Sequence, residues 1–251
     1  MRLRVIGTGS AGNAYLLEAD GGNTLLLDAG VSLRDITAAL EKPSSLQACL
    51  VTHEHMDHAK AAGKLLERGI PVLMSKGTGK ALALGNTLGP TAFVSVSANR
   101  AYRIGDVFTI LPFAAEHDAA EPLGYLIRDD QTGEVLLYAT DTYYLRNTFP
   151  QVHYWLIECN YCTETLDAQF TAGTLPLAMR GRLIQSHMSL DRLLDVFRAN
   201  DLHIARKIIL CHLSDQRSDE KRMVEEVHAL TGVDTIAAHA GDVIDLKETP
   251  F

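Results

Sequence analysis

A short run of histidines and carboxylates, placed directly after an apolar segment, is the feature that most constrains this chain. The run is His53-Glu54-His55-Met56-Asp57-His58, and the apolar segment 46–52 before it is typical of a β-strand. A helical pattern follows at 59–68, so we expect the run to lie on a loop at a strand's end. Imidazoles and carboxylates are the ligands of zinc, and they also suit manganese or iron. The run therefore predicts a metal site.

Three further candidate ligands come from distant parts of the chain. His117, Asp141 and His212 each follow an apolar, strand-like segment. Because the carboxyl ends of strands can open onto one shared cleft, we expect these side chains to complete the site begun by residues 53–58. A lone histidine is more often structural than metal-binding. These three gain weight only because the run at 53–58 needs partners.

Short strand-like runs alternate with helical patterns from one end of the chain to the other. We expect strands at 3–6, 15–18, 24–28, 46–52, 71–74, 107–112, 124–128, 135–139, 154–158, 207–211 and 243–246. We expect helices at 31–41, 59–68, 189–199 and 218–230. This pattern predicts an α/β (α+β) fold, an αββα sandwich of two mixed β-sheets flanked by helices. With 251 residues and no obvious linker, we predict a single domain over 1–251.

Composition restricts the classes of partner. The formal net charge of −8 argues against loose, charge-driven binding to nucleic acid, although a local basic patch or bound cations can still serve a nucleic-acid substrate. No apolar run approaches the ~20 residues that span a bilayer. The four cysteines are too few for a disulfide framework, and Cys159 and Cys162 lack a second pair to complete a structural zinc site. We therefore expect a cytoplasmic protein without a membrane partner, and the oligomeric state stays open.

A glycine motif near the amino terminus suggests a different fold. Residues 7–12, Gly-Thr-Gly-Ser-Ala-Gly, match the dinucleotide-binding pattern Gly-x-Gly-x-x-Gly. That mechanism needs a helix directly after the glycines, but only seven residues separate Gly12 from the turn that begins at Asp20. We therefore predict a glycine-rich turn between two strands of a sheet, and we expect Asp28 to be a structural carboxylate that holds a loop.

The chain resembles the metallo-β-lactamase superfamily over essentially its whole length. Within it, the chain is similar to the YycJ/WalJ-like group, which is related to ribonuclease Z and the β-CASP nucleases. The matching stretches are 9–13, 27–30, 52–58, 141–142, 158–160, 186–189 and 212–214. Ser186 stands where relatives often carry glycine, and His239 has no assignable role.

The resemblance implies a metallo-β-lactamase fold and two divalent ions, Zn²⁺ first, with Mn²⁺ or Fe as alternatives. It implies a ligand set of His53, His55 and His117 for one ion, a set of Asp57, His58 and His212 for the other, and Asp141 as a bridge with a hydroxide between the ions. Asp57 is also counted among the catalytic residues. Because β-lactamases proper commonly carry cysteine in place of this bridging carboxylate, antibiotic hydrolysis is not expected.

The last ligand remains a choice between two histidines. In the nuclease branch the later one, His212, binds metal, while His187 donates a proton and Glu158 orients it. A thioesterase resembling glyoxalase II would use His187 as the ligand instead. The paired presence of Glu158 and His187 favours the nuclease interpretation. Ser10 and Asn13 on the glycine turn are candidates for contact with substrate phosphate, the alternative being that they only shape the turn.

Three functions follow from these residues. The leading hypothesis is a phosphodiesterase acting on nucleic acid, with exonuclease-like activity on DNA. Only 45 residues lie between Asp141 and His187, which leaves no room for a β-CASP insertion, and no long arm of the tRNA-processing type is evident. The alternative is a small-molecule phosphodiesterase or a glyoxalase II-type thioesterase, which the acidic balance favours. A di-iron redox protein with a flavin partner is the third possibility.

Overall fold

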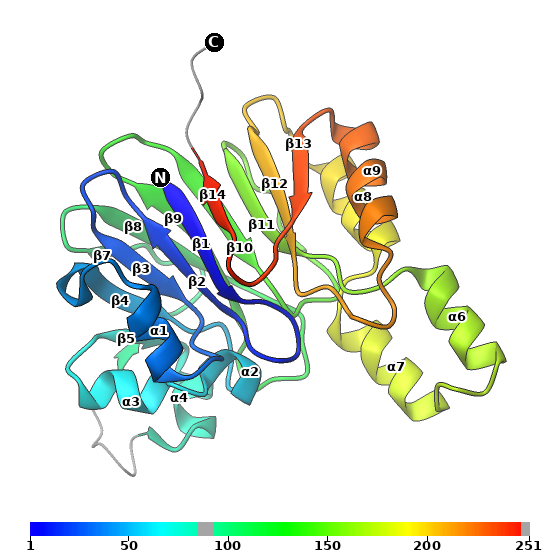
Figure 1. Cartoon of the computed structure of the whole chain (residues 1–251), viewed down its shortest axis with the longest axis horizontal. Coiled ribbons are helices and arrows are strands. Elements are labelled where there is room, and N and C mark those ends of the chain that lie inside the picture. Colours follow the sequence, from blue (N-terminus) through cyan, green and yellow to red (C-terminus); the bar gives the residue numbers. More distant parts are fainter. Residues whose placement is uncertain (85–92, 247–251) are drawn as a thin grey trace. The chain divides into compact units, whose positions relative to one another are not determined.

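The computed structural model describes residues 1–84 and 93–246 (Figure 1). Within these residues the chain separates into two compact units. Unit 1 contains 1–84, 93–114, 119–134 and 238–246, and unit 2 contains 115–118 and 135–237. That the whole chain forms one domain stays a prediction.

In the described part of the chain the first sheet has seven strands, all in unit 1, in the order β14-β1-β2-β3-β4-β5-β6. Strands β14, β1, β2 and β3 run antiparallel to their neighbours, whereas β3 to β6 are parallel, so the sheet is mixed. The bounds are β1 Arg2–Gly7, β2 Ala14–Glu18, β3 Thr24–Leu27, β4 Leu46–Leu50, β5 Val72–Met74, β6 Val94–Ser95 and β14 Val243–Asp245.

The glycine motif is a turn between antiparallel strands, as predicted. Strands β1 and β2 pair directly, with Gly7 opposite Ala14, so no crossover helix intervenes. The amide of Gly12 donates to the carbonyl of Gly9 at 3.0 Å. A Cβ on Gly7 would lie 2.5 Å from the Gly12 carbonyl oxygen, so close packing of the turn explains this glycine.

Helices of unit 1 pack against the first sheet. They are α1 Leu33–Ala39, α2 Met56–Ala59, α3 Ala62–Glu67 and α4 Lys76–Ala81, with a 3₁₀ turn at Pro43–Ser45. Ser32 caps α1, its side chain accepting from the amide of Asp35. Ile36 and Leu65 from these helices are fully buried in a cluster with Leu26 and Val51 of the sheet region.

One helix expected at 59–68 is in fact two, and the first begins earlier, at Met56. The break has a physical reason in two backbone hydrogen bonds. The amide of Ala29 donates to the His58 carbonyl at 2.7 Å, and the amide of Ala61 donates to the Ala29 carbonyl at 2.8 Å. The prediction that residues 53–58 all lie on a loop is therefore wrong for its second half, since Asp57 and His58 lie on α2.

Within residues 1–84 and 93–246 the second sheet also has seven strands, β7 to β13. In unit 1, β7 Tyr102–Ile104, β8 Phe108–Ala114 and β9 Leu123–Asp129 form an antiparallel meander. In unit 2, β10 Val135–Ala139, β11 Tyr154–Glu158, β12 Lys207–Cys211 and β13 Asp234–Ala237 are all parallel. The bounds predicted for β10, β11 and β12 match, because parallel strands that are buried on both faces have continuous apolar sequences.

The helices of unit 2 are α6 Thr163–Thr171, α7 Leu177–Ser186, α8 Leu190–Ala199 and α9 Glu220–Thr231. Ser189 caps α8, its side chain accepting from the amide of Arg192. The sequence did not indicate α6 and α7, and α7 carries the exposed apolar side chains Leu177 and Met179. The chain thus has two mixed β-sheets and flanking helices, which confirms the predicted fold class. No helix in the described part of the chain is long and apolar enough to cross a bilayer.

Candidate metal centre

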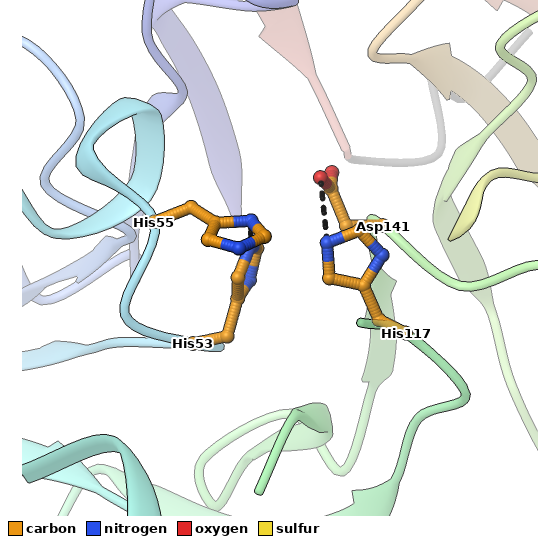
Figure 2. Close-up of side chains that lie close together, drawn as sticks. All are labelled: His53, His55, His117 and Asp141. Atoms are coloured by element: carbon orange, nitrogen blue, oxygen red, sulfur yellow. Dashed lines mark hydrogen bonds and ion pairs between the residues drawn. The ribbon is translucent and has the colours of Figure 1, made fainter. Parts of the chain in front are cut away.

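The segment that joins β4 to α2 holds the first histidine pair. Thr52 is anchored by Asp28, whose Oδ1 accepts from the Thr52 amide at 2.8 Å. His53 follows and is almost fully buried. Its Nε2 lies 3.0 Å from Nδ1 of His55, so the two ring nitrogens face one another (Figure 2). When neither nitrogen carries a proton, this pair can donate to one cation.

Helix α2 presents the next two candidate ligands. His58 is fully buried, and its Nδ1 donates to Oδ2 of Asp28 at 2.7 Å. That bond fixes the tautomer and leaves the lone pair on Nε2, which lies 3.5 Å from Oδ2 of Asp57. A carboxylate that holds the far nitrogen of a histidine is the usual support for a metal-binding imidazole. Asp28 therefore has a larger role than the loop-holding carboxylate that we expected.

The glycine turn packs directly beneath α2. The amide of Asn13 donates to the Asp57 carbonyl at 2.7 Å, and Nδ2 of Asn13 lies 3.1 Å from Nε2 of His58. Asn13 is fully buried and also bonds the Gly9 backbone, whereas Ser10 is exposed. These contacts show that Asn13 shapes the turn. Contact of Ser10 or Asn13 with substrate stays a prediction.

In unit 2, His117 and Asp141 form a second pair. Nδ1 of His117 donates to the Ser186 carbonyl at 2.8 Å, which leaves its Nε2 as the lone-pair nitrogen. That Nε2 lies 3.6 Å from Oδ2 of Asp141 (Figure 2). Burial lowers the pKa of His117, and the nearby Asp141 carboxylate offsets this only in part. The neutral imidazole, which is the form that binds metal, is thus favoured.

Glu158, at the end of β11, is buried and accepts several hydrogen bonds. Its Oε1 accepts from Nδ1 of His187 at 2.7 Å and from Nδ1 of His212 at 2.9 Å. Its Oε2 accepts from the amides of Thr142 and Met188, both at 3.1 Å. Burial opposes ionisation, but His187 and His212 together hold the pKa of the Glu158 carboxyl below its ordinary value. Glu158 is therefore an ionised and fully hydrogen-bonded carboxylate.

The interaction with Glu158 also shifts the pKa of His187. Burial alone would lower the pKa of His187, but the charge and hydrogen bond of Glu158 outweigh it and the net shift is upward. The ring of His187 stacks on that of His212 with centroids 5.3 Å apart. Asp141, Glu158, His187 and His212 offer ligand atoms that all lie within 4.8 Å of one another. The choice between His187 and His212 as ligand stays open.

Asn160 is a residue of this network that the sequence did not single out for a role. Its Nδ2 donates to the His212 carbonyl at 2.8 Å, which holds the backbone at the residue after β12. The only signal was its position in the segment 158–160, directly after a strand.

The donors fit a divalent cation. The potential ligand residues are His53, His55, Asp57 and His58 in unit 1 and His117, Asp141, Glu158, His187 and His212 in unit 2. Imidazole nitrogens whose other nitrogen is anchored, together with carboxylates, are the donor set of zinc and related metals. Two mixed sheets with such donors at strand ends are the architecture of a metal-dependent hydrolase.

Comparisons with known proteins agree with this class. The model of the family described as "Beta-lactamase superfamily domain" matches residues 23–213. The exodeoxyribonuclease WalJ of Streptococcus pneumoniae serotype 2 (strain D39 / NCTC 7466) is 29% identical over 260 residues, covering 97% of this chain and 91% of that protein. The exodeoxyribonuclease YycJ of Bacillus anthracis is 30% identical over 201 residues, covering 73% and 70%.

Solved structures show the same fold. The metallo-β-lactamase fold protein YhfI of Bacillus subtilis has a TM-score of 0.73 at 18% identity, covering 96% of this chain and 98% of that one. Zn²⁺-bound PqqB of Methylobacterium extorquens has a TM-score of 0.72 at 16% identity, covering 98% and 100%. The chain belongs to the metallo-β-lactamase superfamily and is a metal-dependent hydrolase.

Proposed function

We propose that this chain is a phosphodiesterase that degrades DNA from an end. The observation that carries the proposal is the pair formed by buried Glu158 and partly buried His187, joined by a hydrogen bond of 2.7 Å. A phosphodiester needs a proton on its leaving oxygen, and a histidine held by a carboxylate is suited to supply it. The exodeoxyribonuclease names of two relatives, WalJ and YycJ, support the choice of DNA.

Two divalent ions complete the proposed site. His53, His55 and His117 would hold one ion, Asp57, His58 and His212 the other, and Asp141 would bridge them. Zn²⁺ is the first choice and Mn²⁺ or Fe the alternatives. When bound, such a pair of ions supplies a water molecule of lowered pKa and offsets the negative charge that builds up on a phosphodiester.

The chain's own residues would orient the substrate and move the proton. Nδ1 of His187 donates to Glu158, so the ring's other nitrogen, Nε2, is the atom proposed to protonate the leaving oxygen. Glu158 positions that ring, and the amides of Thr142 and Met188 hold Glu158 in turn. All four cysteines are buried thiols, which fits the reducing cytoplasm that we propose as the protein's location.

The test is an assay of the purified chain with Zn²⁺ or Mn²⁺ on four DNA substrates. Linear single strands with a 5′-phosphate and with a 5′-hydroxyl are compared with linear duplex and with circular single-stranded DNA. We expect mononucleotides from linear DNA and none from the circle, because an exonuclease needs an end. Intact linear DNA with either metal would overturn the proposal. Turnover of S-lactoylglutathione by the same preparation would then identify a thioesterase.

A further inference from the structure

Unit 2 contains an open cavity of about 630 Å³ beside His117. Asp118, Tyr143 and residues of α7 and the start of α8 line it, among them Arg182 and Arg192. Its volume falls within the range of ~300–1,000 Å³ that is usual for ligand pockets. His117 connects the cavity to the proposed metal-binding residues, but the proposed chemistry uses none of the other lining residues.

Arg192 is a partly buried cation held in one orientation. Its Nη1 donates to the carbonyls of Tyr143 at 3.2 Å and Ile184 at 2.6 Å. The guanidinium carbon lies 5.2 Å from the centroid of the Tyr143 ring, a cation–π contact. Among residues 1–84 and 93–246, Arg192 forms no ion pair with a carboxylate. Its charge is thus positioned by neutral groups, and an anion in the cavity would offset it.

Arg182 adds a second cation on the neighbouring helix. Its side chain is 69% exposed, and its Nε donates to Oδ2 of Asp118 at 3.0 Å. Because an exposed ion pair of this kind contributes little to stability, Arg182 can exchange Asp118 for another anion at small cost. Arg182 and Arg192 together outweigh the one lining carboxylate, Asp118, so the cavity is locally basic in a chain whose formal net charge is −8.

We propose that this cavity binds a phosphate group of the DNA strand, one that neighbours the bond to be cleaved. Arg192 and Arg182 would contact its oxygens. Guanidinium groups suit phosphate because their N–H donors form a planar fork. The inference rests on the proposed nuclease function and deepens it, since it names the residues that would distinguish a strand of DNA from a small phosphodiester.

A binding experiment tests this without relying on turnover. The metal-loaded full chain is titrated into a 3′-fluorescein-labelled, phosphorothioate single-stranded 12-mer, and anisotropy is followed from 50 to 300 mM salt. The variants are Arg182→Gln and Arg192→Lys, the second of which keeps a charge in case the partly buried position does not tolerate a neutral side chain. The matched control is Arg180→Gln, because Arg180 lies on the same helix but pairs with Asp167 on α6.

We expect Arg182→Gln to weaken binding roughly tenfold, the effect of one lost hydrogen bond to a charged group. The slope of log K against log salt should become shallower by about 0.7, the value for one phosphate contact on a single strand. Arg192→Lys should weaken binding in the same direction, and Arg180→Gln should match the wild type. A 5′-phosphate and a 5′-hydroxyl strand distinguish a terminal phosphate from an internal one, and a loss with either supports the inference.

Two outcomes would overturn it. One is that both variants bind the 12-mer like the wild type, and the other is that the salt slope of Arg182→Gln stays unchanged although its affinity falls. The failure of the proposed function appears elsewhere, as a wild-type chain that leaves linear DNA intact. The two failures can therefore be told apart.

Discussion

Three residues of the candidate site have a left-handed backbone conformation that side-chain-bearing residues seldom adopt. They are Asp28 with φ 56°, Asp141 with φ 47° and His212 with φ 54°. Asp28 and His212 directly follow β3 and β12, and Asp141 lies two residues past the end of β10. Such a conformation costs ~1–3 kcal/mol and persists where the surroundings hold it, often at functional sites. The strained backbone positions are therefore those of two carboxylates and one imidazole that the proposed metal site uses.

The role of Asp28 leads to a prediction about metal affinity. In Asp28→Ala, Nδ1 of His58 loses its acceptor and the Thr52 amide loses its anchor. We expect metal affinity to fall by ~10- to 100-fold, as is usual when the partner of a metal-binding histidine is removed. Competition with a chelating dye measures this. Asp28→Asn keeps an acceptor oxygen and should lose less, and an unchanged affinity in Asp28→Ala would contradict the assignment.

The role of His187 leads to a prediction about leaving groups. In His187→Ala, turnover of DNA should fall by ~100- to 10,000-fold, the usual contribution of a general acid. Bis(p-nitrophenyl) phosphate should lose much less, because nitrophenolate departs without a proton. Steady-state kinetics on both substrates measure the difference. His203→Ala is the control, since His203 is exposed and pairs with Asp201. Equal losses on both substrates would rule out proton donation by His187.

At the scale of elements, the turn after β3 packs closely against the short helix α2. A Cβ on Gly30 would lie 1.7 Å from the Asp57 carbonyl oxygen and 2.7 Å from the Asn13 amide nitrogen. Both contacts are with backbone atoms, which cannot rotate away. The close approach places α2, and with it Asp57 and His58, against the glycine turn.

Gly30→Ala should therefore displace α2. We expect a loss of stability of about 3 kcal/mol, the upper end of the usual range for overpacking, together with reduced metal content. Urea denaturation and elemental analysis give the two readouts. Gly63→Ala is the matched control, because Gly63 lies within α3 and, among the described residues, its Cβ would meet the Leu84 side chain at an ordinary 3.6 Å. Alanine is favoured over glycine in a helix by ~1 kcal/mol, so this control should be at least as stable as the wild type. A Gly30→Ala protein with wild-type stability would show that the close packing is dispensable.

At the scale of the whole molecule, the proposed ligand residues are distributed over about 160 positions of the sequence, from His53 to His212. A cation that binds only the folded chain stabilises it, by ~2.7 kcal/mol at a free concentration 100 times Kd. Metal binding and folding should therefore be coupled in this chain.

Removal of metal with EDTA should lower the Tm and abolish activity, and Zn²⁺ or Mn²⁺ should restore both. Elemental analysis of the reloaded chain should find two ions per chain. Since imidazoles must be neutral to bind, metal affinity should fall as the pH is lowered and the ligand histidines become protonated. One ion per chain at saturation would contradict the dinuclear site, and a Tm that EDTA leaves unchanged would contradict the coupling.

The sequence by itself determined the elements whose patterns are local. Strands β10, β11 and β12 were predictable as continuous apolar runs, and the run at 53–58 identified itself by spacing alone. Helices α6 and α7 were not predictable, because exposed apolar residues such as Leu177 and Met179 blur the amphipathic pattern from which helices are recognised. The cavity beside His117 was not predictable either, because residues of α7 line it.

Only the tertiary structure decided how each functional side chain is oriented. Asp28 meets His58 across 30 positions of sequence, and Glu158 meets His187 and His212 across 29 and 54. Hydrogen bonds of this kind depend on strand register and on single left-handed residues, which a one-dimensional pattern does not encode. Residue types and their spacing determine which metal-binding groups are available, whereas packing determines which nitrogen of each imidazole keeps its lone pair for a metal.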